Sequence, residues 1–353
     1  MRLHVWWIVV ALVWAGGCSS DHPTTTAAPS SKPGAWVEDD VSFVTDGLTT
    51  YGTYRHREGA PPAAAALLIS ESGSTDRNGD NAVAGKIGTL RALATLLSDR
   101  GVATLRYDKV GTGKTGLGPY DKRAGDVGNA VFTEEAKGAV RFLAEQKGTD
   151  PSRISAYGHG EGAVRALTLA TDTSVGAPKI HALGLLAPLA GRYLDLVTER
   201  VRKDLDAQAK AGQISPQQAK ETLEAWLAAV AQARANGTVP DKLPHGLSAI
   251  LNPGNVKAVL ETDAIDPLAL AAQIPAGTPV LLTCSDSDGQ ASCEAVQPLA
   301  NALAHSALTF VQLKGVSHVL KDDPTDNIGN YAKDQPLSPQ FVDALNSFVR
   351  PVS

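Results

Sequence analysis

The chain has 353 residues, of which 43% are hydrophobic and 20% are charged. This length and composition are typical of a globular protein that buries a large core, either as one domain with an insertion or as two domains. The formal net charge of -5 provides no basic face, which argues against a nucleic-acid partner. Nothing in the sequence sets an oligomeric state.

The first residues are typical of a secretory signal. Arg2 precedes an apolar run over residues 5–15, too short for a comfortable membrane span, and small residues follow up to Cys18. Small residues directly before a cysteine resemble a bacterial lipobox, although Ala15 stands where that motif usually has Leu. The alternative is an ordinary signal peptide with an incidental cysteine. We expect residues 1–17 to be a lipoprotein signal peptide, and lipidated Cys18 to anchor the protein to the outer face of the cell membrane.

The next segment, residues 18–36, is rich in Ser, Thr and Pro and has few large apolar side chains. Such a segment cannot bury enough apolar surface to offset the entropy of ordering it. We therefore expect a disordered tether between the membrane and the folded domain.

From residue 37 onward the pattern alternates between strands and helices. Two β-rich runs flank Asp46 and Gly47, a pair suited to a tight hairpin. An apolar run at residues 63–70 predicts a buried strand, and helical spacing follows over residues 85–101. The same alternation continues to about residue 189, which predicts an α/β fold: a mostly parallel central sheet with helices on both faces.

The alternation stops over residues 190–275, where two long amphipathic segments follow each other. The second opens with Ser215 as N-cap, Pro216 at the first helical position and Gln218 three residues after the cap. We expect a helical cap inserted into a core formed by residues 37–189 and 276–353. The alternative is a helical hairpin that merely covers the edge of the sheet.

The stretch VGTGKT at residues 110–115 superficially resembles a phosphate-binding loop. That loop requires Gly where this chain has Asp108, and a lone GTGKT is weak evidence. We therefore expect no nucleotide site, no cofactor and no metal.

Candidate catalytic residues follow three predicted strands, at the edge where open α/β sheets bind ligands. Residues 158–162 read GHGEG, the frame of the G-x-S-x-G nucleophile elbow with Gly160 in place of the serine. A later strand is followed by Asp286 and Asp288, and the last strand by His318. The order nucleophile, acid, histidine is that of α/β-hydrolases. Asp288 fits the acid better than Asp286 because it lies farther from the strand end.

Several blocks together resemble bacterial α/β-hydrolases of the carboxylesterase and serine aminopeptidase-like type, over residues 40 to 350. The blocks are LLISESGSTDRNGD (67–80), RYDKVGTGKT (106–115), GHGEGA (158–163), IDP (265–267), CSDSD (284–288) and GVSHVLK (315–321). The resemblance implies an α/β-hydrolase fold with an esterase-like ancestry. It further implies that His318 is the general base and Asp288 its orienting carboxylate.

By the same resemblance, the oxyanion hole is formed by the backbone N–H of Glu161 and by the loop at Ser72 and Gly73. Three residues near the site depart from the family pattern: Glu71 for a glycine, Ser74 for a proline and Val110 for an arginine. A carboxylate at residue 71 would oppose the negative charge that develops in the oxyanion hole.

Gly160 is the decisive departure, because covalent acyl transfer needs an oxygen or sulfur nucleophile beside the histidine. Removing the nucleophile of a triad costs about a million-fold in turnover. We therefore expect a degenerate hydrolase that binds a small ester-like or lipid-like ligand, or a partner. The alternative is a working ester or amide hydrolase, in which His318 and Asp288 activate water or a substitute nucleophile such as Ser72.

Two further cysteines, Cys284 and Cys293, lie nine positions apart. An exported protein meets an oxidising compartment, so we expect one disulfide that closes a short loop. The alternative is two free thiols, and metal binding would need more ligands than this pair provides nearby.

Overall fold

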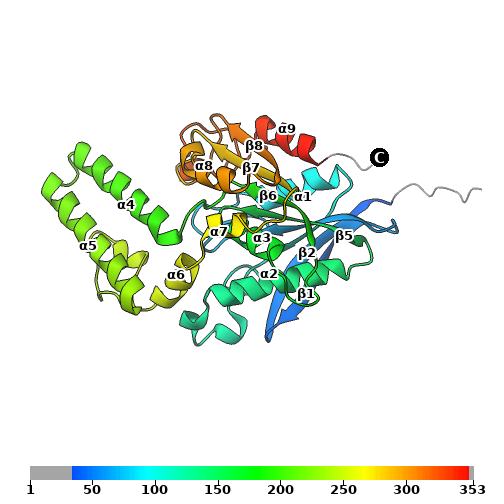
Figure 1. The fold of residues 1–353 in the computed structure, drawn as a ribbon, viewed down its shortest axis with the longest axis horizontal. Helices are drawn as coiled ribbons and strands as arrows, with labels where there is room; N and C mark the ends of the chain where they lie inside the picture. Colours follow the sequence, from blue (N-terminus) through cyan, green and yellow to red (C-terminus); the bar gives the residue numbers. More distant parts are fainter. Residues whose placement is uncertain (1–33, 350–353) are drawn as a thin grey trace, which may run out of the picture. The chain divides into compact units, whose positions relative to one another are not determined.

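The computed structural model describes residues 34–349, so the predicted signal peptide, Cys18 and most of the predicted tether lie outside the described residues. Its centre is one eight-stranded sheet in the order β1-β2-β4-β3-β5-β6-β7-β8 (Figure 1). The first two strands pair antiparallel, as do β2 and β4, and all other neighbours are parallel. The strands are β1 Trp36–Thr45, β2 Leu48–Arg57, β3 Ala63–Ile69, β4 Ala103–Tyr107, β5 Thr149–His159, β6 Ile180–Leu186, β7 Pro279–Ser285 and β8 Ala307–Leu313.

The predicted hairpin joins β1 to β2 through Asp46 and Gly47. Their φ angles are 50° and 80°, as a two-residue turn with both central residues left-handed requires. The predicted helix at residues 85–101 is shorter in the structure: α1 covers Thr89–Ser98. It begins later because Gly88 adopts a φ of 75°, which no helical residue has.

Helices cover both faces of the sheet. On one face α2 (Asn129–Ala144), α3 (Gly162–Ala170), α7 (Pro267–Ala271) and α8 (Cys293–Ala302) pack in sequence against one another. On the other, Arg100 just after α1 donates to Asn346 of α9 (Pro339–Phe348) over 2.9 Å. Strands β3, β6 and β7 are mainly apolar and buried between these layers, and β4 is also buried, whereas the first half of β5 is polar and partly exposed.

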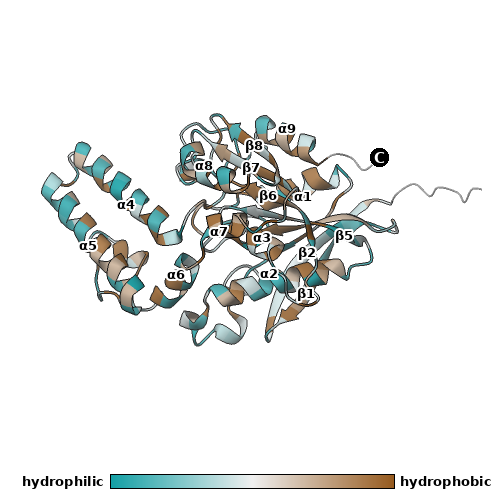
Figure 2. Cartoon of the chain, in the orientation of Figure 1, coloured by the Kyte–Doolittle hydropathy of each residue, from teal (hydrophilic) through white to brown (hydrophobic). Residues whose placement is uncertain are grey.

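The segment between β6 and β7 forms helices α4 (Tyr193–Lys210), α5 (Pro216–Asn236) and α6 (Val256–Asp263). These helices have their own apolar cluster around the fully buried Trp226. Figure 2 shows α4 as largely hydrophilic, in contrast to the brown strands of the sheet. The structure forms the predicted capping box, in which Ser215 accepts from the Gln218 backbone and the Gln218 side chain accepts from the Ser215 backbone. Short 3₁₀ helices lie at Gly118–Tyr120, Ala124–Asp126, Leu247–Ala249 and Ile328–Asn330.

A buried carboxylate holds the two ends of this helical segment together. Asp263 at the end of α6 accepts from the side chains of Arg192 and Arg234 and from the backbone N–H of Leu194. Its own side chain is 1% exposed, so these donors replace the water that the charge loses. Within residues 34–349, no helix is both long enough and apolar enough to cross a bilayer.

Candidate active site

The acid and the histidine meet at the carboxyl edge of the sheet. Asp288 follows β7 and His318 follows β8, and His318 Nδ1–H donates to Asp288 Oδ2 over 2.9 Å. The other oxygen of Asp288 accepts from the backbone N–H groups of Gln290 and Ala291. Asp286 instead accepts from the backbone of Gly315. The structure therefore pairs His318 with Asp288 and not with Asp286.

Covalent and polar contacts fix the two loops that carry these residues. The disulfide Cys284–Cys293 brackets the loop with Asp288, joining the end of β7 to the start of α8. In the other loop, the backbone N–H of His318 donates to Asp326 Oδ1 over 2.8 Å. Both loops that carry the pair are thus fixed in place.

The GHGEG stretch forms a tight turn between β5 and α3, with Gly160 at a φ of 55°. A Cβ at Gly158 would overlap the carbonyl of Gly162, and a Cβ at Gly162 would overlap that of Ile69. These two glycines therefore permit the close approach of strand and helix that a nucleophile elbow needs.

A carboxylate occupies the space above Gly160. A Cβ added at residue 160 would coincide with the carboxylate of Glu71, closest to Oε2. The same Oε2 lies 3.1 Å from Nε2 of His318. Glu71, which follows β3, thus contacts the histidine at the position where a serine hydroxyl of the elbow would be. The sequence indicates only that the Glu71 charge opposes an oxyanion, and it does not predict the contact of Glu71 with His318.

The predicted oxyanion donors converge on the same carboxylate. Ser72 N donates to Glu71 Oε1 over 2.7 Å, and Glu161 N lies 3.5 Å from that oxygen. Gly73 follows with a φ of 61° and shapes the turn. The oxyanion hole therefore holds an anion that belongs to the chain itself.

Three charges line up in this buried site. Burial alone would lower the pKa of His318, but Asp288 and then Glu71 raise it to about 10. Burial alone would raise the pKa of Glu71, but the hydrogen bond and charge of His318 lower it well below its usual range. At neutral pH the site is carboxylate, imidazolium, carboxylate. An imidazolium has no free lone pair, so in this state His318 cannot act as a general base.

A cavity of about 500 Å³ opens beside Glu71. Its lining combines the site loops with the helical segment, from which Tyr193 and Val259 contribute. At the start of α3, which also lines it, Arg165 donates to the Glu161 side chain over 3.0 Å. A small ligand in this cavity would reach the Glu71 carboxylate.

Known proteins resemble this chain in structure but not in sequence. No family profile and no curated protein matches the sequence. An esterase of Pyrococcus furiosus has a TM-score of 0.54 and 15% identity over 89% of this chain and 90% of its own. Est1E of Butyrivibrio proteoclasticus, solved with ferulic acid bound, has a TM-score of 0.53 and 17% identity over 84% and 98%. The α/β hydrolase GrgF of a Penicillium species has a TM-score of 0.52 and 18% identity over 89% and 98%.

The chain has the α/β-hydrolase fold. These likenesses agree with the mostly parallel eight-stranded sheet and the helices on both its faces. Each neighbour is less than 25% identical, so the likeness establishes the fold, and the residues of this chain must decide the chemistry.

The loops below the site are also built from charged residues. Arg77 donates to Asp108 through its backbone and its side chain, which anchors the loop after Glu71 to the end of β4. Lys109 donates to the backbone oxygens of Glu71 and Thr75, and burial lowers its pKa to about 8. A Cβ at Gly113 would overlap Asp108, so that glycine of the GTGKT stretch serves close packing.

Glu71, His159 and His318 form the one cluster of three metal-ligating side chains within residues 34–349, with ligand atoms within 4.8 Å of one another. Two of these atoms, Oε2 of Glu71 and Nε2 of His318, already contact each other at 3.1 Å. Moreover, Nε2 of His159 contacts the carbonyl of His318 at 2.8 Å. These residues could hold a metal after a rearrangement, and as they stand they form hydrogen bonds.

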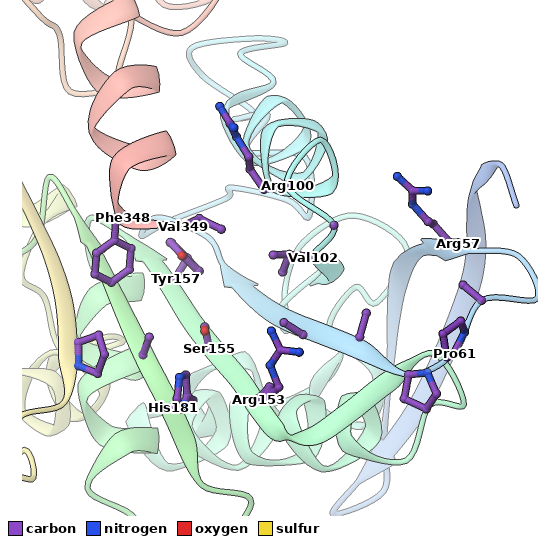
Figure 3. A pocket seen from close by; sticks show the side chains of 17 residues that line it. Arg57, Pro61, Arg100, Val102, Arg153, Ser155, Tyr157, His181, Phe348 and Val349 are labelled. Atoms are coloured by element: carbon purple, nitrogen blue, oxygen red, sulfur yellow. The ribbon is translucent and has the colours of Figure 1, made fainter. Parts of the chain in front are cut away.

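Figure 3 shows a second cavity, of about 550 Å³, lined by Arg57, Arg100, Arg153 and His181. It lies near the amino ends of β3, β6 and β7. Open α/β sheets bind their substrates at the opposite, carboxyl ends. The cavity beside Glu71 is therefore the better candidate for the reaction site.

Proposed function

We propose that this α/β-hydrolase-fold protein does not perform serine-type acyl transfer, and that it binds a small ester-like or lipid-like ligand in the cavity beside Glu71. The observation that carries the proposal is the Glu71 carboxylate, which contacts His318 and accepts from the oxyanion donors. A single side chain thus takes the places of the nucleophile and of the substrate oxygen.

Three obstacles oppose ester hydrolysis in such a site. The elbow has no nucleophilic atom, because residue 160 is glycine. The oxyanion hole already holds a negative charge, which would repel a second one. The histidine is already protonated, because its pKa is raised to about 10.

Hydrolysis of p-nitrophenyl esters by the full-length protein in detergent tests this proposal. We expect no activity from the unmodified protein or from Gly160→Ser, because a side chain at residue 160 would overlap Glu71. We expect Glu71→Gly/Gly160→Ser to gain activity, since it frees the hole and supplies the hydroxyl. Circular dichroism confirms that each variant is folded. Ester hydrolysis by the unmodified protein that Glu71→Gln leaves unchanged would refute the proposal.

The second candidate function is a working hydrolase with a substitute nucleophile. It is favoured by the intact contact between Asp288 and His318, which a pure binding scaffold would not need. Ser72 is a poor choice for that nucleophile, because Nε2 of His318 already contacts Glu71.

We further propose that the protein is an exported lipoprotein, anchored by lipidated Cys18 and held through the segment between Cys18 and the start of β1 at Trp36. The support is the signal-like sequence that ends at Cys18. Mass spectrometry of the protein purified from membranes tests it, since the N-terminal peptide should begin at Cys18 and carry acyl chains. An unlipidated N-terminus elsewhere would refute it, and Cys18→Ala should release the protein from the membrane.

A further inference from the structure

We propose that Glu71 is itself a nucleophile, and that the ligand of the cavity is a small alkyl electrophile: a molecule with a leaving group on a saturated carbon. The inference rests on the proposed loss of acyl transfer, and it replaces the ester-like or lipid-like ligand with this more specific class. It changes the role of Glu71 from an obstacle to acyl transfer into the reacting group for a different reaction.

The position of the carboxylate supports this role. Glu71 Oε2 lies where the side chain of an elbow nucleophile would begin, and it is 3.1 Å from Nε2 of His318. Glu71 also lines the cavity beside the elbow. The attacking oxygen of Glu71 thus lies close to the position of an elbow nucleophile, although it comes from the end of β3 and not from the end of β5. Gly160 has no side chain and therefore leaves the space for it.

The chemistry of a carboxylate selects the substrate. Attack on an ester carbonyl would produce an acid anhydride, which is less stable than the ester and would not accumulate. Attack on a saturated carbon produces an ordinary ester of Glu71, and carboxylates form such covalent intermediates in other enzymes. The remaining parts of an esterase site are suited to hydrolyse that ester.

In the first step Oε2 of Glu71 forms a bond to the substrate carbon, and the leaving group departs with the electrons of its own bond. A halide leaves as an anion, whereas an epoxide oxygen stays attached through the second ring carbon and takes a proton from water. Alkylation removes the charge of Glu71, one of the two carboxylates that keep His318 protonated. His318 then loses its proton to solvent and becomes a base.

In the second step neutral His318 takes a proton from water, and the hydroxide attacks the carboxyl carbon of Glu71. The developing oxyanion on Oε1 faces the N–H groups of Ser72 and Glu161. The bond from the Glu71 carboxyl carbon to the substrate-bound oxygen breaks, the alcohol leaves with a proton, and the carboxylate returns. For a bromide the sum is alkyl bromide plus water giving alcohol, bromide and a proton; for an epoxide it is epoxide plus water giving a diol.

These two reaction steps assign a chemical role to each unusual or retained residue of the site. Asp288 orients His318, His318 activates water, and the oxyanion hole stabilises hydrolysis of the Glu71 ester. A serine esterase would explain neither Glu71 nor Gly160, and a binding scaffold would explain neither Asp288 nor His318.

The test uses the full-length protein in detergent with two probes, the primary bromide 1-bromo-3-phenylpropane and the epoxide styrene oxide. We expect turnover of at least one, and a loss of about a thousandfold or more in Glu71→Gln. Glu199→Gln, on the exposed surface of α4, is the matched control and should keep full activity. In His318→Gln the second step fails, so mass spectrometry should find the alkyl adduct on the peptide with Glu71.

Isotope labelling gives the sharpest readout. After a single turnover in ¹⁸O-water, the label should be in Glu71 and the new hydroxyl of the product should carry unlabelled oxygen from Glu71. Label that enters the product directly would overturn the proposal, since water would then be the nucleophile. Loss of activity with a chelator and recovery with zinc would also overturn it, in favour of a metal on Glu71, His159 and His318.

The two proposals can fail separately. If neither probe reacts while Glu71→Gly/Gly160→Ser gains esterase activity, the nucleophilic role of Glu71 is wrong and the loss of acyl transfer stands. If the unmodified protein hydrolyses p-nitrophenyl esters independently of Glu71, the loss of acyl transfer is wrong.

Discussion

The two halves of the site resemble a hydrolase triad to different degrees. The acid–base half, Asp288 and His318 after β7 and β8, has the geometry of a hydrolase triad. The nucleophile half, after β3 and β5, departs from that geometry, and we call the two the retained half and the rebuilt half: residue 160 has no side chain, and Glu71 fills the space that one would take. Because both halves meet at Nε2 of His318, the change in one resets the charge of the other. A retained histidine is therefore not by itself evidence of a working base.

The halves are also anchored by different means. The loop of Asp288 is closed by a disulfide, whereas the loop after Glu71 is tied to β4 by the buried ion pair of Arg77 and Asp108. Four measurements can test how far the halves depend on each other. One restores the nucleophile half, two loosen the anchor of each half in turn, and one titrates His318, which both halves share.

The largest effect should come from removing the acid once the nucleophile is restored. In the Glu71→Gly/Gly160→Ser background, we expect Asp288→Asn to lower kcat for p-nitrophenyl acetate by about 10⁴-fold, because the histidine then loses its orientation and its tautomer. Asp286→Asn serves as control, since Asp286 contacts Gly315 and not His318. A loss of less than about tenfold would mean that the retained half does not work as a triad.

The anchor of the rebuilt half should dominate stability. Asp108→Asn leaves the buried guanidinium of Arg77 without its main partner, and breaking a buried ion pair in this way costs about 3–5 kcal/mol. Denaturant unfolding measures the loss. Asp40 pairs with the same arginine but its side chain is 79% exposed, so Asp40→Asn should cost less than about 1 kcal/mol. Equal effects would contradict a special role for the buried contact.

The sequence predicted the retained half better than the rebuilt one. Strand ends fix which residues share an edge of a parallel sheet, so Asp288 and His318 could be expected together. The position of the Glu71 side chain depends on a contact with Glu161, which lies 90 positions later in the chain. No local sequence pattern encodes such a contact. A glycine at the elbow and a new carboxylate after β3 are nevertheless complementary in volume. This complementarity is the feature of the sequence that could reveal the contact between Glu71 and the elbow.

The same limit applies to the helical segment. Its capping residues and amphipathic spacing predicted α5 correctly, because both act within one or two turns. The buried contacts of Asp263 with Arg192 and Arg234 join residues far apart in the chain, so the sequence could not show how the segment is held.

The anchor of the retained half should have a smaller effect than that of the rebuilt half. We expect Cys284→Ser/Cys293→Ser to lose about 2–3 kcal/mol, since the disulfide closes a short loop and thereby restricts the unfolded chain. Urea unfolding measures it, and a reductant should lower the stability of the parent protein to that of the variant. Unchanged stability after reduction would show that the loop is held by the hydrogen bonds of Asp288 alone.

The smallest effect, and the most direct link between the halves, is the titration of His318. Its pKa is raised to about 10, so the folded state binds more protons than the unfolded one between about pH 6.5 and 10. The stabilisation from its charge is therefore complete below about pH 6.5 and is lost as the pH rises through 10. Global unfolding measurements would combine this effect with that of Lys109. The pKa of Lys109 is lowered to about 8, so its deprotonation stabilises the folded state as the pH rises, opposite to the effect of His318.

The NMR resonances of the His318 ring separate the two groups. At pH 7.5 they should be those of an imidazolium, and Glu71→Gln should lower the pKa by about 1 or more, equivalent to about 1.4 kcal/mol, because one of its two carboxylate partners is gone. Asp326→Asn is the control, because Asp326 accepts from the backbone of His318 and not from its ring. A neutral ring at pH 7.5 in the unmodified protein would mean that the rebuilt half leaves the base of the retained half intact, and ester hydrolysis would again need only a nucleophile.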